Sequence, residues 1–497
     1  MTVLAPVLWP LFVAALLLLA WRRPRLQRVG SVLGSFGHVW LSAELVRVVL
    51  ANGLQVTELG GWRAPFGIVF VADRLGAAMA MVTAVVGLAS TIYSVSGIDS
   101  RREAFGYHAL VQVLLAGVCG AFLTGDLFNL YVWFEVMLMS SFVLLALGGE
   151  KKQMMGALQY VALNLISSIV FLSALGLLYG LVGSLNMADV AVRLPQAQND
   201  GLVAAICSLL ALAFGIKAAV FPVYVWLPSS YHTPPTIVSA LFAGLLTKVG
   251  VYALIRSQVL FFDVSTPWMR LILLAVGILT MVFGVMGAVA QGGFRRVLSF
   301  HIVSQIGYMI LGLAWMTPMA LAATVFYVLH HILVKTNLFF IAGIARRHCH
   351  TEELSRMGGL YARYPGLALL FLIPAMSLAG LPPLSGFWAK LFILKAGVDL
   401  ESWWPVVAAL VVGFFTLFSM LKLWNEAFWK SPPEELPDKP DPAIGRQRWR
   451  VIPVVMLAGG TVAFGVFAGP VLDFSLEAAK ELLNPQIYVD AVLGDRS

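Results

Sequence analysis

The sequence predicts an all-helical protein that crosses a membrane about fourteen times. The first observation is composition: 60% of the 497 residues are apolar and only 12% are charged, against about 25% charged residues in soluble domains. The second is that the apolar residues form runs of roughly 20, the length an α-helix needs to cross a bilayer. The third is that basic residues gather in alternate loops between these runs.

Each predicted span is an apolar run bounded by charged or helix-breaking residues. The spans cover residues 3–21, 30–50, 75–97, 107–124, 127–148, 158–182, 202–226, 236–260, 269–290, 297–314, 319–344, 366–396, 403–428 and 450–470. The first span is predicted to be a permanent membrane helix and not a cleaved signal peptide, because no basic segment precedes it and four arginines follow it. The tail after the last span contains a short amphipathic helix, expected on the outer surface or against a partner.

The loop charges predict the orientation of these spans. With the N-terminus outside, nineteen lysines and arginines fall in the inner loops and four in the outer loops and tail. Short cytoplasmic loops carry the excess of basic residues in membrane proteins. The sequence therefore predicts a membrane protein with both termini outside.

Two predicted spans are interrupted by proline. The seventh contains Pro222 and Pro228, and the twelfth contains Pro374, Pro382 and Pro383. Proline breaks the hydrogen-bond ladder of a helix, and at membrane depth such breaks persist only where protein or water satisfies the freed groups. A simple packing kink is the alternative. Two multiply broken helices, five spans apart and each carrying a lysine, favour paired repeats around a transport path.

The resulting organisation has five parts. Because the broken helices are an odd number of spans apart, one five-helix repeat is expected to be inverted relative to the other. The predicted parts are three N-terminal spans (1–106), a first repeat of spans 4–8 (107–262), a second repeat of spans 9–13 (263–430), a cytoplasmic loop (431–449), and the last span with an external amphipathic tail (450–497).

Five charged residues lie in the middle of predicted spans: Glu135, Lys217, Lys248, Lys335 and Lys390. A charge at the bilayer centre costs roughly 2.5–3.5 kcal/mol on insertion scales, and such residues usually mark ion or proton pathways. Glu135 is either an acid neutralised by burial or one partner of an ion pair. With Lys217 as that partner, it would form a switchable proton site.

Two histidines accompany Lys335. His331 and Lys335 are four residues apart and share a helix face, whereas His330 points about 100° away. Histidine titrates near neutrality and relays protons, although a hydrogen-bonded core histidine is the alternative. His301 adds a further polar group to the tenth span, together with Ser299, Ser304 and Gln305. The row as a whole suits lateral proton transfer.

Other chemistry finds little support in the sequence. Nucleotide-binding, haem and iron–sulfur motifs do not occur, so no cofactor is expected. The adjacent residues His348, Cys349 and His350 lack further ligands, so no metal site is expected there. The net charge of +8 is explained by topology, so nucleic-acid binding is not expected either.

Spans 4–13 resemble the antiporter-like proton-translocating subunits shared by respiratory complex I, membrane hydrogenases and Mrp cation/proton antiporters. Within that family, several stretches are similar to the D subunits of Mrp Na+/H+ antiporters. They are TGDLFNLYVWFEVMLMSSFVLLALGG, VYVWLPSSYHTPPTIVSALFAGLLTKVGVYALIR and the tail LLNPQIYVDAVLG. Lysine at position 390 argues against the complex I subunit that has glutamate there.

The resemblance implies the function and its residues. The positions matching the family's proton-translocating residues are Glu135, Lys217, Lys248, His330, His331, Lys335 and Lys390. The implied activity is proton translocation coupled to Na+ export, driven by the proton motive force, and not enzyme catalysis. The implied partners are a larger A-type subunit and small membrane subunits of the same complex. The alternative is a proton-pumping subunit of a complex I-like or hydrogenase-type redox complex.

Overall fold

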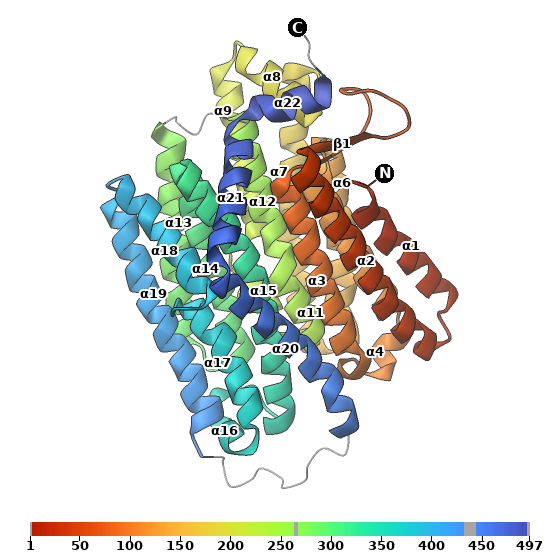
Figure 1. Cartoon of the computed structure of the whole chain (residues 1–497), viewed down its shortest axis with the longest axis vertical. Coiled ribbons are helices and arrows are strands. Elements are labelled where there is room, and N and C mark those ends of the chain that lie inside the picture. Colours follow the sequence, from red (N-terminus) through yellow and green to blue (C-terminus); the bar gives the residue numbers. More distant parts are fainter. Residues whose placement is uncertain (1, 263–266, 432–443, 495–497) are drawn as a thin grey trace.

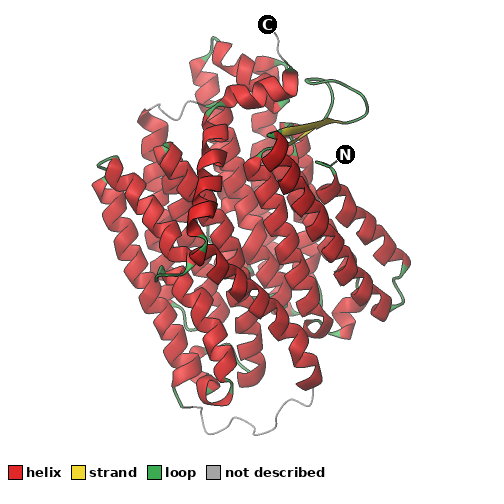
Figure 2. Cartoon of the chain, viewed as in Figure 1, coloured by secondary structure: helices red, strands yellow, loops and turns green. Residues whose placement is uncertain are grey.

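The computed structural model describes residues 2–262, 267–431 and 444–494. In these ranges the chain is helical almost throughout (Figure 2). Eleven helices are long and apolar enough to cross a membrane, and three shorter apolar helices cover Ala5–Leu19, Tyr107–Leu123 and Pro365–Ala379. The structure therefore confirms the predicted all-α membrane architecture.

The N-terminal part consists of three spans and a small hairpin. Its elements are α1 (Ala5–Leu19), α2 (Pro24–Asn52), β1 (Gln55–Glu58), β2 (Val69–Ala72), α3 (Arg74–Gly97) and α4 (Ser100–Ala104). The strands pair antiparallel at the upper end of Figure 1. Asp73 begins α3 as an N-cap, because its side chain accepts a hydrogen bond from the backbone of Gly76.

The next part contains the first broken span. Its elements are α5 (Tyr107–Leu123), α6 (Leu127–Ala146), α7 (Lys151–Val182), α8 (Met187–Arg193), η1 (Leu194–Gln196), α9 (Asp200–Ala218), α10 (Trp226–Ser230), α11 (Thr236–Leu241), the π-helical η2 (Phe242–Leu246) and α12 (Thr247–Phe261). The predicted seventh span ends as a helix at Ala218 and resumes as the short α10. The eighth is continuous through η2.

The remaining part contains the second broken span. Its elements are α13 (Pro267–Ala290), α14 (Phe294–Trp315), α15 (Pro318–Cys349), η3 (Leu354–Arg356), α16 (Leu360–Arg363), α17 (Pro365–Ala379), α18 (Ser385–Asp399), α19 (Trp403–Leu423), the π-helical η4 (Trp424–Trp429), α20 (Ile444–Val466), α21 (Ala468–Leu483) and α22 (Pro485–Leu493). The tail helix α21 packs against α15 of the same chain, and α22 crosses the upper end beside α8 (Figure 1).

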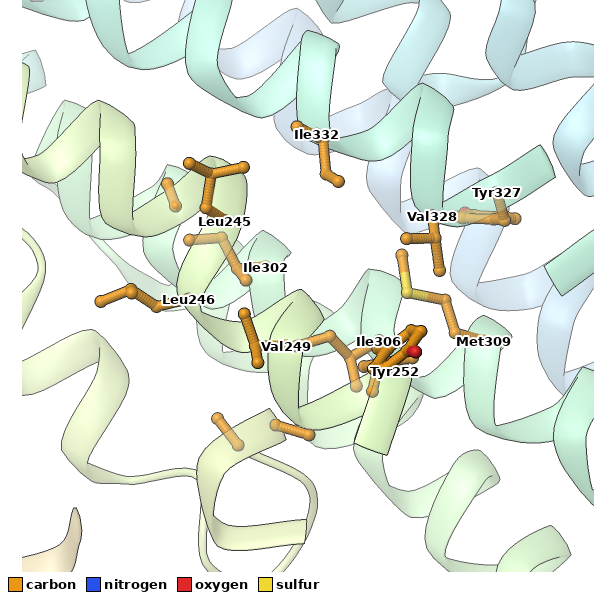
Figure 3. Packing of buried hydrophobic residues seen from close by; sticks show 14 of the residues in the cluster. Leu245, Leu246, Val249, Tyr252, Ile302, Ile306, Met309, Tyr327, Val328 and Ile332 are labelled. Atoms are coloured by element: carbon orange, nitrogen blue, oxygen red, sulfur yellow. The ribbon is translucent and has the colours of Figure 1, made fainter. Parts of the chain in front are cut away.

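Burial separates central from peripheral spans. The most apolar stretch is 100% buried in α11–α12 and 94% buried in α14 and α15, against 39% in α7, α13 and α19. Apolar side chains of the central helices interlock, as Val249, Ile306 and Val328 do in Figure 3. The outer helices turn large apolar side chains such as Leu158 and Phe414 outward, where lipid can cover them. The central helices are therefore shielded from lipid.

Two loop pairs repeat one hydrogen-bond pattern. Before α6, Leu127 N donates to Leu185 O at 2.9 Å, and Met187 N donates to Gly125 O at 2.9 Å. Before α14 the same pattern recurs. There Phe294 N donates to Glu352 O at 2.9 Å, and Leu354 N donates to Gly292 O at 2.8 Å. The first pair adjoins α8 at the upper end of Figure 1, and the second leads toward α16 at the lower end.

A buried ion pair joins the upper ends of α3 and α12. Arg256 Nη2 lies 2.5 Å from Asp73 Oδ2 and 3.2 Å from the Tyr252 hydroxyl, and both charged side chains are over 90% buried. Beside it, Arg74 pairs with Glu481 at the end of α21. These contacts fix the tail helix to the helix bundle.

Replacing Arg256 by methionine should therefore lower stability strongly. Removing one partner of a buried pair leaves an uncompensated charge and costs about 3–5 kcal/mol. Thermal unfolding in detergent would measure this loss. Arg47→Met is the matched control, because Arg47 pairs with Glu44 on the exposed surface, where such pairs are worth about 0–1 kcal/mol. Equal melting temperatures for the two variants would contradict the assignment.

Candidate functional site

The lysines predicted from the sequence lie in the protein interior, on α9, α12, α15 and α18. Lys248 and Lys335 are fully buried, and Lys217 and Lys390 are 6% and 8% exposed. Glu135, on α6, is half-buried. The structure thus places all four lysines inside the protein and away from lipid.

Lys217 lies in the last turn of α9. The helix ends because Ala219 adopts a left-handed conformation with φ of 61°, and the indole of Trp226 donates to the freed carbonyl of Ile216 at 3.0 Å. The ammonium donates to Ser168 Oγ at 3.3 Å and lies 4.8 Å from the Phe134 ring centroid. A cation in the last turn of a helix is stabilised by the helix dipole.

Glu135 adjoins this lysine through its neighbour Phe134. The carboxylate attracts the Lys217 ammonium, but their charged atoms do not approach within the 4.0 Å of an ion pair. Glu135 Oε1 is buried and has no hydrogen-bond partner among the described residues. The Glu135 carboxylate and the Lys217 ammonium therefore lie near each other without forming a direct ion pair.

Lys248 sits just after the π-helical segment η2. A π segment shifts the backbone so that a carbonyl loses its usual partner, and such segments are frequent at functional sites. Lys248 Nζ donates to the carbonyl of Ala243, within η2, at 2.5 Å. Lys335 on α15 donates to the carbonyl of Leu298 on α14 at 3.2 Å. The two ammonium groups are close enough to repel each other.

The two histidines of α15 face different neighbours, as their spacing predicts. His330 Nδ1 lies 2.8 Å from Ser385 Oγ at the start of α18. His331 is fully buried near Lys248 and Lys335. Neither ring nitrogen of His331 has a hydrogen-bond partner among the described residues. His331 therefore lies near Lys248 and Lys335 without a hydrogen bond to either, whereas His330 contacts α18 through Ser385.

Lys390 reaches across the break between α17 and α18. Its ammonium donates to the carbonyl of Ala379, the last residue of α17, at 2.9 Å, and lies 5.5 Å from the Tyr308 ring centroid. Gly380 adopts a φ of 95°, and a Cβ there would come within 2.9 Å of the lysine stem. Glycine is thus required at position 380 so that the Lys390 side chain can pass the backbone there.

Several polar side chains join the predicted residues. Tyr327 donates to Gln305 Oε1 at 2.6 Å and stacks on Tyr308. Ser385, which contacts His330, also lies 3.1 Å from Ser377 across the break. Sequence reasoning noted Gln305 but missed both tyrosines and both serines. Ser385 closely follows the prolines that mark the break, and this position in the sequence could have identified it as a candidate.

His301 of α14 lies beside the same row. Its Nε2 lies 2.8 Å from Ser419 Oγ on α19, and the charges of Lys335 and Lys390 both act on it. Within the described ranges, no group of three histidine, cysteine or acidic side chains could hold a metal ion. The site is thus a line of ionisable and hydroxyl groups.

This fold and its buried row define a polytopic membrane protein with ionisable groups buried among its helices. A family model described as NADH:quinone oxidoreductase/Mrp antiporter, transmembrane, matches residues 124–416. The chain therefore belongs to this family. The matched range contains every residue of the predicted row.

Comparison with individual proteins agrees. The chain is 42% identical to the D subunit of the Na+/H+ antiporter from Alkalihalophilus pseudofirmus over 99% of both chains. Its fold superimposes on a chain of the Mrp complex from Dietzia sp. with a TM-score of 0.91, at 32% identity and 99% coverage of both. A chain of an archaeal membrane-bound sulfane sulfur reductase gives a TM-score of 0.89 at 26% identity, again with 99% coverage of both.

Replacing Lys248 by methionine should raise thermal stability. The lysine is fully buried and meets one carbonyl, so an apolar side chain of similar length removes a desolvation cost of roughly 2.5–3.5 kcal/mol on insertion scales. Lys395→Met is the matched control, because that lysine pairs with Asp399 on the exposed surface. The melting temperature in detergent should rise by several degrees only for the buried position. A fall would show that Lys248 stabilises the fold.

Proposed function

We propose that the chain is the proton-translocating subunit of a multisubunit Na+/H+ antiporter of the Mrp type. It acts as a secondary transporter and not as an enzyme. Protons enter along the buried row, driven by the proton motive force, and Na+ leaves through the assembled complex. The observation that carries the proposal is the row of buried lysines and histidines, in a chain 42% identical to an Na+/H+ antiporter subunit.

Unpartnered polar atoms along the row support proton transfer. Atoms without a hydrogen-bond partner among the described residues include the His331 ring nitrogens, the Asn337 side-chain amide, Gln305 Nε2 and Thr247 Oγ1. Buried polar groups are normally satisfied by protein or by ordered water. Water beside these groups would connect neighbouring proton carriers.

The charges suggest how the row works. Glu135 and Lys217 form an ion-pair switch that opens and closes, Lys248 with His330, His331 and Lys335 relays protons laterally, and Lys390 is the terminal donor or acceptor. Like charges at close range disfavour simultaneous protonation. Because Lys248 and Lys335 repel each other, a proton gained by one promotes release from the other.

The fold proposed with this function has fourteen transmembrane helices and two inverted repeats. Eleven long helices and three shorter apolar ones support that number. The matched loop hydrogen bonds before α6 and α14 support the repeat of spans 4–8 in spans 9–13. Each repeat also contains one broken span and one π-helical segment, η2 or η4. The five sequence divisions, including 107–262 and 263–430, follow these units.

We place this subunit in the bacterial cell membrane with both termini outside. The arginine-rich loops after α1 and around α16 support that orientation, because basic loops remain on the cytoplasmic side. Further Mrp subunits, a larger A-type chain and small membrane chains, are the proposed partners. The similar chain of the Dietzia structure, which comes from an Mrp complex, supports that assembly.

A redox-driven proton pump is the second candidate. The fold similarity to a sulfane sulfur reductase chain favours it, but the identity is 26% there against 42% for the antiporter subunit. Purification of the native complex separates the two. Cofactor-free membrane partners are expected, whereas co-purifying flavin or iron–sulfur proteins would favour redox coupling.

Glu135→Ala and Lys217→Ala should each abolish Na+/H+ exchange in everted vesicles. Each variant removes one member of the proposed switch, so the acid or the base can no longer pass a proton. Lys395→Ala, at an exposed position, is the matched control and should leave exchange unchanged. Size-exclusion chromatography would confirm assembly of each variant. Exchange at the parental rate in either variant would reject the proposed role.

A further inference from the structure

The first three spans contain a second buried polar line, separate from the row in α6–α18. On α2, the residues Gln27, Ser31, Ser35, His38 and Ser42 recur every three or four positions and therefore share one helix face. None is more than 2% exposed. At membrane depth a buried polar face needs partners.

Helix α5 supplies some of them. Gln112 Nε2 donates to Ser35 Oγ at 3.1 Å, and Cys119 Sγ lies 3.5 Å from His38 Nε2. Both α5 residues are fully buried. Two levels of the line are therefore defined by direct contacts, one at Ser35 and one at His38.

Helix α3 adds a further hydroxyl. Gly87 of α3 packs on Leu115 of α5, and the two helices run antiparallel. One turn further along, the register places the fully buried Ser90 level with Gln112. Three helices thus contribute polar groups at the level of Ser35.

Several of these groups have no partner among the described residues. They are the hydroxyls of Ser31, Ser42 and Ser90 and the side-chain oxygen of Gln112. A serine inside a helix usually bonds back to its own backbone, as Ser140 and Ser208 do. The three unpartnered serines do not, so something other than the described residues satisfies them.

The close approach of α1 does not account for the serines. Small residues in membrane helices let neighbouring backbones approach, and on α2 glycines serve that purpose. Gly30, Gly34 and Gly37 lie against side chains of α1, on a different face from the polar line. The serines are therefore not needed for that approach.

The lower end of the line carries a carboxylate that is paired with basic side chains. Arg28 donates two hydrogen bonds of 2.6 Å to Glu103 of α4, and His108 Nε2 lies 3.0 Å from the same carboxylate. Burial raises the pKa of Glu103, but the hydrogen bonds from His108 and Arg28 outweigh it and lower the pKa to about 2. Its charge is thus already matched.

We propose that this line admits water from the arginine-rich lower end of α2 as far as Ser42, and so serves as a half-channel. The stretch from Gln27 to Ser42 rises about 22 Å. Above it, the apolar residues Leu45, Val49 and Phe70 belong to one packed cluster and close it. The line offers neutral oxygens without a free carboxylate, which favours water and the protons it carries over a metal cation. The inference is independent of the proposed antiport and takes only the cytoplasmic side from the proposed orientation.

Silver-ion accessibility of introduced cysteines tests the half-channel. Ser31→Cys and Ser35→Cys are made in the full chain, within its complex, after replacing Cys119, Cys207 and Cys349 by alanine. Ag+ is added to vesicles of either orientation, and the thiols left unblocked are labelled with maleimide after unfolding. Leu45→Cys, in the apolar cluster, and Leu33→Cys, on the outward face of α2, are the matched controls.

The rate of thiol blocking is the measured quantity. Thiols react through the hydrated thiolate, so Ag+ should block the Ser31→Cys and Ser35→Cys variants about tenfold faster than the two controls, from the cytoplasmic side. Rates equal to the controls, or reaction only from the opposite side, would overturn the proposal. Protection by Na+ but not by choline would replace the water file with a cation site. Size-exclusion chromatography shows that each variant assembles.

Discussion

An ammonium group buried in a membrane protein must find acceptors inside the protein, and carbonyls at interruptions of a helix are the readiest ones. Every carbonyl within a regular helix already accepts a hydrogen bond from its own ladder. Lys390 meets the carbonyl of Ala379 at the end of α17, and Lys248 meets that of Ala243 in a π-helical segment. Lys217 occupies the last turn of α9. Interruptions of helices therefore hold three of the four lysines.

This constraint explains why the site costs stability and yet persists in the fold. Broken and π-helical segments cannot face lipid, because their freed groups need protein or water. Of these segments, η2 lies in a stretch that is 100% buried, whereas the stretches that contain Lys217 and η4 are 50% and 39% buried. The lysines at the breaks are nevertheless shielded individually, because the side chains of Lys217 and Lys390 are themselves buried.

The two polar lines differ in chemistry. The row from α6 to α18 contains titratable groups and crosses the chain laterally, whereas the line on α2 is made mainly of hydroxyls and an amide and runs along one helix. Charges recur along the first, whereas in the second they gather at the lower end, where Arg28 and His108 contact Glu103. Membership of the NADH:quinone oxidoreductase/Mrp antiporter transmembrane family covers residues 124–416, so the line on α2 lies outside the matched range.

The sequence by itself determined the helical membrane architecture, the broken spans and the identity of the row, because apolar run length, proline and isolated charge are local signals. It also separated His330 from His331 by helical spacing. Only the tertiary structure decided what each residue meets: the open gap between Glu135 and Lys217, the carbonyl that receives Lys390, and the tyrosine pair Tyr308 and Tyr327. These contacts join residues far apart in the chain, and their geometry depends on how the helices pack, which no local pattern encodes.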